Sequence, residues 1–115
     1  MRWAVLIMCV IGVAGGCGED EHRPVPIPEA VAHPTDPVWC PRARRDESKR
    51  MRGAFDARRL IGLAWHEAEA RATERDCTLR VVWEDGEGST ITGAADRTRI
   101  DVYVDDGRVV GVEWG

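Results

Sequence analysis

The sequence predicts an α+β fold in which one helix packs on a small mixed sheet. Two observations support this prediction: a single helix-forming stretch at residues 64–76, and three later segments in which apolar residues alternate, at 78–84, 98–105 and 109–114. The sheet is expected to contain a parallel pair joined by a long exposed loop, followed by a C-terminal antiparallel hairpin. A chain of 115 residues has room for one small domain of this kind.

Residues 1–16 have the composition of an export signal. Arg2 supplies a positive charge, and the apolar run at residues 4–14 is roughly 17 Å long as a helix, too short for a ~30 Å hydrocarbon core. Ala14 and two glycines then precede Cys17, which resembles a bacterial lipoprotein signal whose cysteine is acylated. This resemblance implies a lipid anchor on Cys17 and a place in the cell envelope. Ordinary cleavage at the same bond would instead give a periplasmic or secreted protein.

The remaining cysteines can be assigned by parity. If Cys9 leaves with the signal and Cys17 carries lipid, Cys40 and Cys77 can form one disulfide in an oxidising compartment. No metal site and no cofactor are predicted, because the cysteines and the three histidines lack the spacing of metal ligands. The histidines are His22, His33 and His66.

Residues 17–52 are predicted to be a tether. All six prolines lie between Pro24 and Pro41, and residues 24–28 have the composition of an extended polyproline spacer. Residues 42–52 then carry six positive and two negative charges. This basic stretch can be interpreted as a patch for anionic lipid or cell-wall polymer, or as a solvated segment leading into the domain.

Residues 53–115 are expected to form the folded domain. The helix presents a narrow apolar face, and an Asp-Gly turn at residues 105–108 joins the last two strands. The residues expected to face the core are Trp65, Ala68 and Ala72 on the helix, and on the strands Leu79, Val81, Trp83, Ile100, Val102, Val104, Val110, Val112 and Trp114.

The connection at residues 85–97 is the best candidate for a functional site. It contains three glycines and no helical periodicity, and loops of this length in small domains are usually functional or disordered. A parallel pairing of the flanking strands needs a crossover of about a dozen residues.

From Leu60 to Gly115 the order of elements resembles the potato type I serine-protease inhibitors, and most closely their small secreted bacterial relatives. The resemblance rests on residues 60–62 before the helix, the strand at 99–105, residues 107–109 and the final residues 114–115. It implies a monomer that presents a rigid, substrate-like loop to a subtilisin-, chymotrypsin- or elastase-like protease.

The resemblance also implies which residues act in the loop. Counting back from Arg99 gives Gly93–Ala94 as the reactive bond, although the family usually has a large residue before that bond and an acidic one after it. A second register gives Ile91–Thr92, with Thr90 bracing the loop. The implied loop residues are Thr90, Ile91, Thr92, Gly93, Ala94 and Ala95, and the implied supporting residues are Thr92, Arg97, Arg99 and Asp101.

Charge and motifs narrow the function classes. The net charge of −4, from 16 basic and 20 acidic residues, excludes a globally basic nucleic-acid binder. The chain has no catalytic triad or phosphate-binding glycine motif in a recognisable context, so an enzyme is not predicted. Two hypotheses remain: a tethered serine-protease inhibitor, and a binding module that keeps the inhibitor fold without inhibition.

Overall fold

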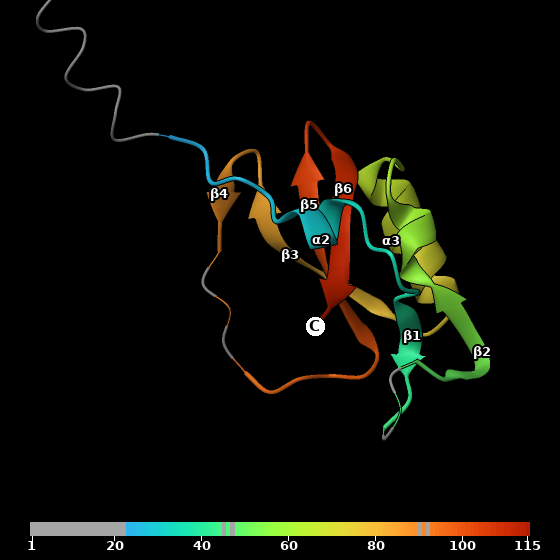
Figure 1. Ribbon diagram of the computed structural model, residues 1–115. Helices are drawn as coiled ribbons and strands as arrows, with labels where there is room; N and C mark the ends of the chain where they lie inside the picture. The colour runs from blue at the N-terminus through green and yellow to red at the C-terminus, as the bar shows by residue number, and fades with distance from the viewer. Residues whose placement is uncertain (1–22, 45, 47, 90, 92) are drawn as a thin grey trace, which may run out of the picture.

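A four-stranded sheet with one main helix forms the centre of the computed structural model, which describes residues 23–44, 46, 48–89, 91 and 93–115. The strand order is β4-β3-β5-β6, with β3 (Thr78–Glu84) parallel to β5 (Arg99–Asp105) and β5 antiparallel to β6 (Arg108–Trp114). The helix α3 (Trp65–Glu74) precedes β3 (Figure 1). The α+β class, the parallel pair and the C-terminal hairpin are therefore confirmed. The predicted signal (1–16) and Cys17 lie outside the described residues.

One face of the sheet forms the core with α3. Leu79 pairs with Ile100 and Val81 with Val102, so these side chains share a face. The other residues of this core include Leu60 from η2 (Ala57–Leu60) and the two helix alanines, Ala68 and Ala72, which are fully buried.

Two β-bulges change which residues this face buries. In β3 the register shifts between Val81 and Trp83, so Trp83 pairs with Tyr103 on the opposite face. In β6 the shift leaves Val110 half-buried and places Val109 in the core beside Val112. The predicted faces containing Trp83 and Val110 are therefore wrong, because one inserted residue reverses the alternation beyond it.

The long connection is shorter than predicted. Asp85 and Gly86 both have positive φ, 49° and 92°, and make a two-residue turn into the short antiparallel strand β4 (Glu87–Gly88). Asp106 and Gly107, with φ of 51° and 76°, form the similar turn between β5 and β6, as expected. The loop proper therefore covers residues 89–98.

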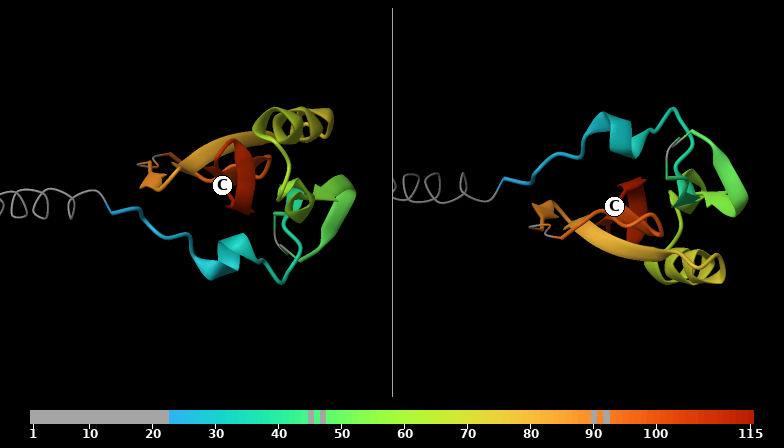
Figure 2. Two further views of the ribbon diagram at one scale, coloured as in Figure 1. Left: turned by 90° about the horizontal axis from the view of Figure 1, so that it is seen from above. Right: turned by 90° about the horizontal axis from the view of Figure 1, so that it is seen from below.

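The predicted tether is wrong for the part of residues 17–52 that the structure describes, because much of it packs on the domain. The short helix α2 (Glu29–Ala32) lies against β6, and β1 (Trp39–Arg42) pairs with β2 (Arg50–Asp56) in a separate antiparallel hairpin. Val31, Val38 and Cys40 are buried. These apolar residues lie between the prolines and cover surface that the domain would otherwise expose. Figure 2 shows α2 and α3 on opposite sides of the sheet.

The start of this N-terminal segment is held by the edge of the sheet. The Val25 N–H donates to the Gly86 carbonyl at 2.8 Å, and the Trp83 indole Nε1 donates to the Val25 carbonyl at 2.8 Å. A side chain at Gly86 would collide with Pro24, since a Cβ there would lie 2.9 Å from the Pro24 Cβ.

Among the described residues, no helix is long and hydrophobic enough to cross a membrane.

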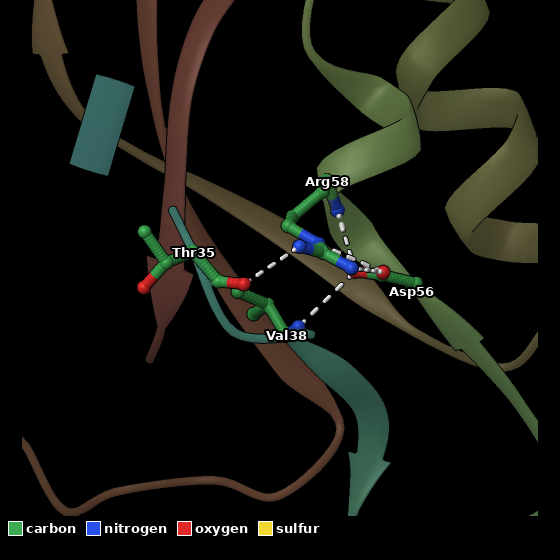
Figure 3. Close-up of polar contacts among 4 residues, drawn as sticks. All are labelled: Thr35, Val38, Asp56 and Arg58. Carbon is green, nitrogen blue, oxygen red and sulfur yellow. Dashed lines mark hydrogen bonds and ion pairs between the residues drawn. The ribbon is translucent and has the colours of Figure 1, made fainter. Parts of the chain in front are cut away.

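Asp56 fixes the middle of the same segment (Figure 3). Its Oδ1 accepts hydrogen bonds from the N–H groups of Val38 and Arg58, both at 3.1 Å. The Arg58 guanidinium donates Nε to Asp56 Oδ2 at 2.8 Å and Nη1 to the Thr35 carbonyl at 3.1 Å. The carboxylate thus joins the segment before β1 to the end of β2.

The predicted disulfide is present. Cys40 in β1 is bonded to Cys77, the residue just before β3, with a Cα–Cα distance of 6.4 Å. Both cysteines are fully buried. The bond therefore connects the β1–β2 hairpin to the central sheet.

Replacing Asp56 with asparagine should reduce the loss of domain stability that occurs as the pH falls. Burial alone raises the pKa of the Asp56 carboxyl, but the hydrogen bonds from Arg58 and Val38 outweigh it and lower the pKa. A depressed folded-state pKa stabilises the fold above the unfolded value of about 4, and this contribution is lost as the pH falls through the folded pKa. In thermal unfolding followed by circular dichroism, Asp56→Asn should have the lower Tm at pH 7. The difference in Tm between the variant and the wild type should become smaller below about pH 4. A gap that stays constant over this range would contradict the prediction.

Candidate functional site

The loop of residues 89–98 leaves the edge of the sheet and returns to the start of β5 (Figure 1). It begins where the Ser89 N–H donates to the Val82 carbonyl at 2.9 Å. The described residues from Ile91 to Arg97 are all exposed, and the Ile91 side chain is a large apolar group that is 46% exposed. Thr90 and Thr92, two predicted loop residues, lie outside the described residues.

Arg99 contacts the loop, as the resemblance implies. It is the first residue of β5, and its Nη2 donates to the Ala94 carbonyl at 2.8 Å. Its Nε is buried and has no hydrogen-bond partner among the described residues. The guanidinium therefore lies between the core strand and the loop backbone, where it restrains the position of Ala94.

A compact turn at Asp96 forms the base of the loop. Asp96 Oδ1 accepts from the Thr98 N–H at 2.9 Å and from the Thr98 hydroxyl at 2.7 Å, and these two bonds lower the pKa of the Asp96 carboxyl. Gly115 joins this turn to the sheet, because its carbonyl accepts from the Asp96 N–H and its own N–H donates to the Arg99 carbonyl. The sequence does not predict Asp96, Thr98 or Gly115 as site residues, although an Asp two positions before a Thr is a known local turn signal.

Asp101 and Arg97, two predicted supporting residues, act differently from the prediction. Asp101 is buried and forms a two-pronged ion pair with Arg80 of β3, at 2.8 and 2.9 Å, instead of contacting the loop. Asp101 still lies under the base of the loop, since a Cβ at Gly115 would be 2.6 Å from its Oδ1. Arg97 contacts the hairpin, where its carbonyl accepts from the Arg42 N–H at 2.8 Å.

Gly115→Ala should loosen the loop. The added methyl group would lie 2.6 Å from Asp101 Oδ1 and 3.0 Å from Arg99 Nε, so both supporting side chains would have to move. We expect a loss of about 1 kcal/mol in the free energy of unfolding, at the low end for overpacking. Limited proteolysis between residues 89 and 98 should also be several-fold faster.

Gly88→Ala is the matched control for this substitution. A Cβ at Gly88 meets only the Val82 carbonyl, at 3.9 Å, an ordinary van der Waals contact. This variant should be cleaved at the wild-type rate. Equal cleavage rates for Gly115→Ala and Gly88→Ala would show that Gly115 does not restrain the loop.

Among the described residues, no group of three or more histidine, cysteine, aspartate or glutamate side chains could hold a metal. What the site presents is an exposed backbone segment attached at both ends to paired parallel strands.

The comparisons with known proteins do not identify a family. No family model, no curated protein and no solved structure matches the chain.

Proposed function

We propose that the chain is an exported serine-protease inhibitor that presents residues 89–98 to the protease as a substrate-like segment. The observation that carries the proposal is the hydrogen bond from Arg99 to the Ala94 carbonyl, in a loop that joins the parallel strands β3 and β5. In this role the chain catalyses no reaction itself. The export signal and Cys17 support a location in the envelope, with a lipid anchor on Cys17.

Inhibition by such a loop depends on the loop being held in one conformation. A segment already held in its bound shape loses little conformational entropy when it enters a protease cleft. If the protease cuts it, the two new ends stay attached through β4 on one side and through Arg99 and Asp96 on the other. They remain close enough to rejoin and slow to leave.

Of the two registers, the backbone favours Ile91–Thr92 as the reactive bond. Gly93 has φ of 106°, a region that L-residues rarely adopt and that an extended substrate strand does not use. Ile91, by contrast, has an exposed branched side chain that can fill a small apolar pocket. This register replaces the predicted Gly93–Ala94 bond and favours an elastase-like specificity.

Incubation with proteases tests the proposal. Purified protein should slow the hydrolysis of a small chromogenic peptide by an elastase- or subtilisin-like protease, with one protein molecule blocking one protease molecule. Mass spectrometry should find a slow, single cut between residues 91 and 92. Rapid cleavage at several bonds within 89–98, with no delay in peptide hydrolysis, would refute it.

The second candidate is a non-inhibitory binding module with the same fold. The positive φ of Gly93 favours it, because a glycine in this conformation loosens a loop whose action depends on stiffness. The rapid-cleavage outcome would support this candidate. Mass spectrometry of the mature N-terminus separately distinguishes a lipid on Cys17 from simple secretion.

A further inference from the structure

The β1–β2 hairpin, residues 39–56, carries an exposed basic surface at its turn. Arg44, Lys49, Arg50 and Arg52 are exposed there. Asp46, a described acidic residue of the turn, is also exposed and accepts hydrogen bonds from the Ser48 hydroxyl and N–H, so it keeps its negative charge and offsets one of the four positive charges. In Figure 1 the turn of this hairpin and the 89–98 loop both extend from the lower end of the molecule. We call this surface the basic hairpin.

The basic hairpin is attached directly to the loop. The Arg42 N–H donates to the Arg97 carbonyl at 2.8 Å, and Arg97 Nη1 lies 3.5 Å from the Arg42 carbonyl. These contacts join the end of β1 to the residue that leads into the turn before β5. A partner that covers the loop therefore approaches the hairpin as well.

Three further contacts fix the hairpin in this position. The guanidinium of Arg42 lies 5.3 Å from the centre of the Trp114 ring, and Trp114 Nε1 donates to the Trp39 carbonyl at 3.2 Å. The disulfide holds Cys40 to the start of β3. These contacts attach the base of the hairpin to the domain, beside the residues that lead into β5.

Acidic residues gather at the opposite end of the sheet. The turns after β3 and β5 meet there, with the Asp106 N–H donating to Asp85 Oδ1 at 2.7 Å. The exposed acidic residues around these turns are Glu84, Asp85, Glu87, Asp105 and Asp106. They lie about one strand length, roughly 20 Å, from the start of β5. This separation of charge would orient the molecule in the electric field of a charged partner. Toward a partner with an acidic surface, the molecule would turn its basic hairpin.

We infer that the basic hairpin is a second contact surface for the partner that binds the 89–98 loop, and that this partner is a protein with an acidic surface beside its binding cleft. The inference rests on the proposed function. A protein partner is favoured over a lipid surface because the hairpin is bonded to the loop itself. Charges at the rim of an interface act mainly on the rate of association and on its salt dependence.

Paired charge-neutralising variants test the inference. Arg44→Gln/Lys49→Gln removes two positive charges from the basic hairpin. The control, Arg59→Gln/Arg71→Gln, removes two from η2 and α3, outside the hairpin turn. With the protease that wild type inhibits, the hairpin variant should associate about 5- to 10-fold more slowly at low salt. The difference should shrink as salt is added, dissociation should change little, and the control should behave as wild type.

The possible failures are distinguishable. If the wild-type protein inhibits no protease, the proposed function fails and this inference falls with it. If inhibition is intact and both variants associate at the wild-type rate, only the inference is overturned. It is also overturned if the hairpin variant inhibits normally but loses binding to phosphatidylglycerol vesicles that wild type binds, since the surface would then serve a membrane.

Discussion

Replacing both Cys40 and Cys77 with serine should lower the free energy of unfolding by about 3–4 kcal/mol, as the chain-entropy relation gives for cysteines 37 residues apart. In a domain of this size that loss corresponds to a fall in Tm of roughly 15–25 °C. Because the bond attaches β1 to the central sheet, the variant should also lose the hairpin's contact with Arg97 and be cleaved faster within the loop.

Thermal unfolding with and without a reducing agent checks this expectation. Wild-type protein unfolded in the presence of dithiothreitol should behave like the double variant, and the double variant should not respond to the reagent. A double variant with the Tm of the oxidised wild type would show that packing around Cys40 and Cys77 suffices without the bond.

Ile91→Gly should weaken inhibition by about 10- to 100-fold. The exposed Ile91 side chain is the proposed anchor in the protease pocket, and an aliphatic side chain of this size contributes roughly 1.5–3 kcal/mol when it is fully buried. The inhibition constant for an elastase-like protease measures the effect. Ala95→Gly is the control, because it adds the same backbone freedom at an exposed loop position without removing the anchor.

Gly93→Leu separates the two registers. If Gly93 precedes the reactive bond, a leucine there should tighten inhibition by at least tenfold, about 1.4 kcal/mol. If Ile91 precedes it, the leucine should give no gain, because a φ of 106° strains any residue with a side chain. If Gly93→Leu strengthens inhibition and Ile91→Gly leaves it unchanged, the Ile91 register is wrong.

The elements with strong local signals were predictable from the sequence. The helix over 65–74 and the strands over 78–84 and 99–105 follow from periodicity, and the Asp106-Gly107 turn follows from residue preference. The faces of the sheet on which Trp83 and Val110 lie were not predictable in the same way. A bulge inserts one residue without a distinctive composition, so the alternation looks regular on both sides of it.

The packing of the N-terminal part of the domain is hard to predict because proline dominates its composition. Prolines favour extended backbone, which is equally consistent with a spacer and with a segment that packs on a sheet. The buried positions among them are Val31 and Val38, and nothing local marks their contact with strands formed much later in the chain. The same holds for the site: Arg99 follows from the order of elements, whereas the contact between Asp96 and Gly115 joins segments that only the fold brings together.

The packing of the earliest described segment on the last strand determines when the domain can be completed. Val31 packs so closely on Gly111 that a Cβ there would lie 2.7 Å from the Val31 Cγ1, and the Trp39 carbonyl is bonded to the Trp114 indole. A chain that emerges from a ribosome or a translocation pore N-terminus first cannot make these contacts until its final strand is released. The native packing around Val31 and Trp39 is therefore completed only after residues 111–114 have emerged.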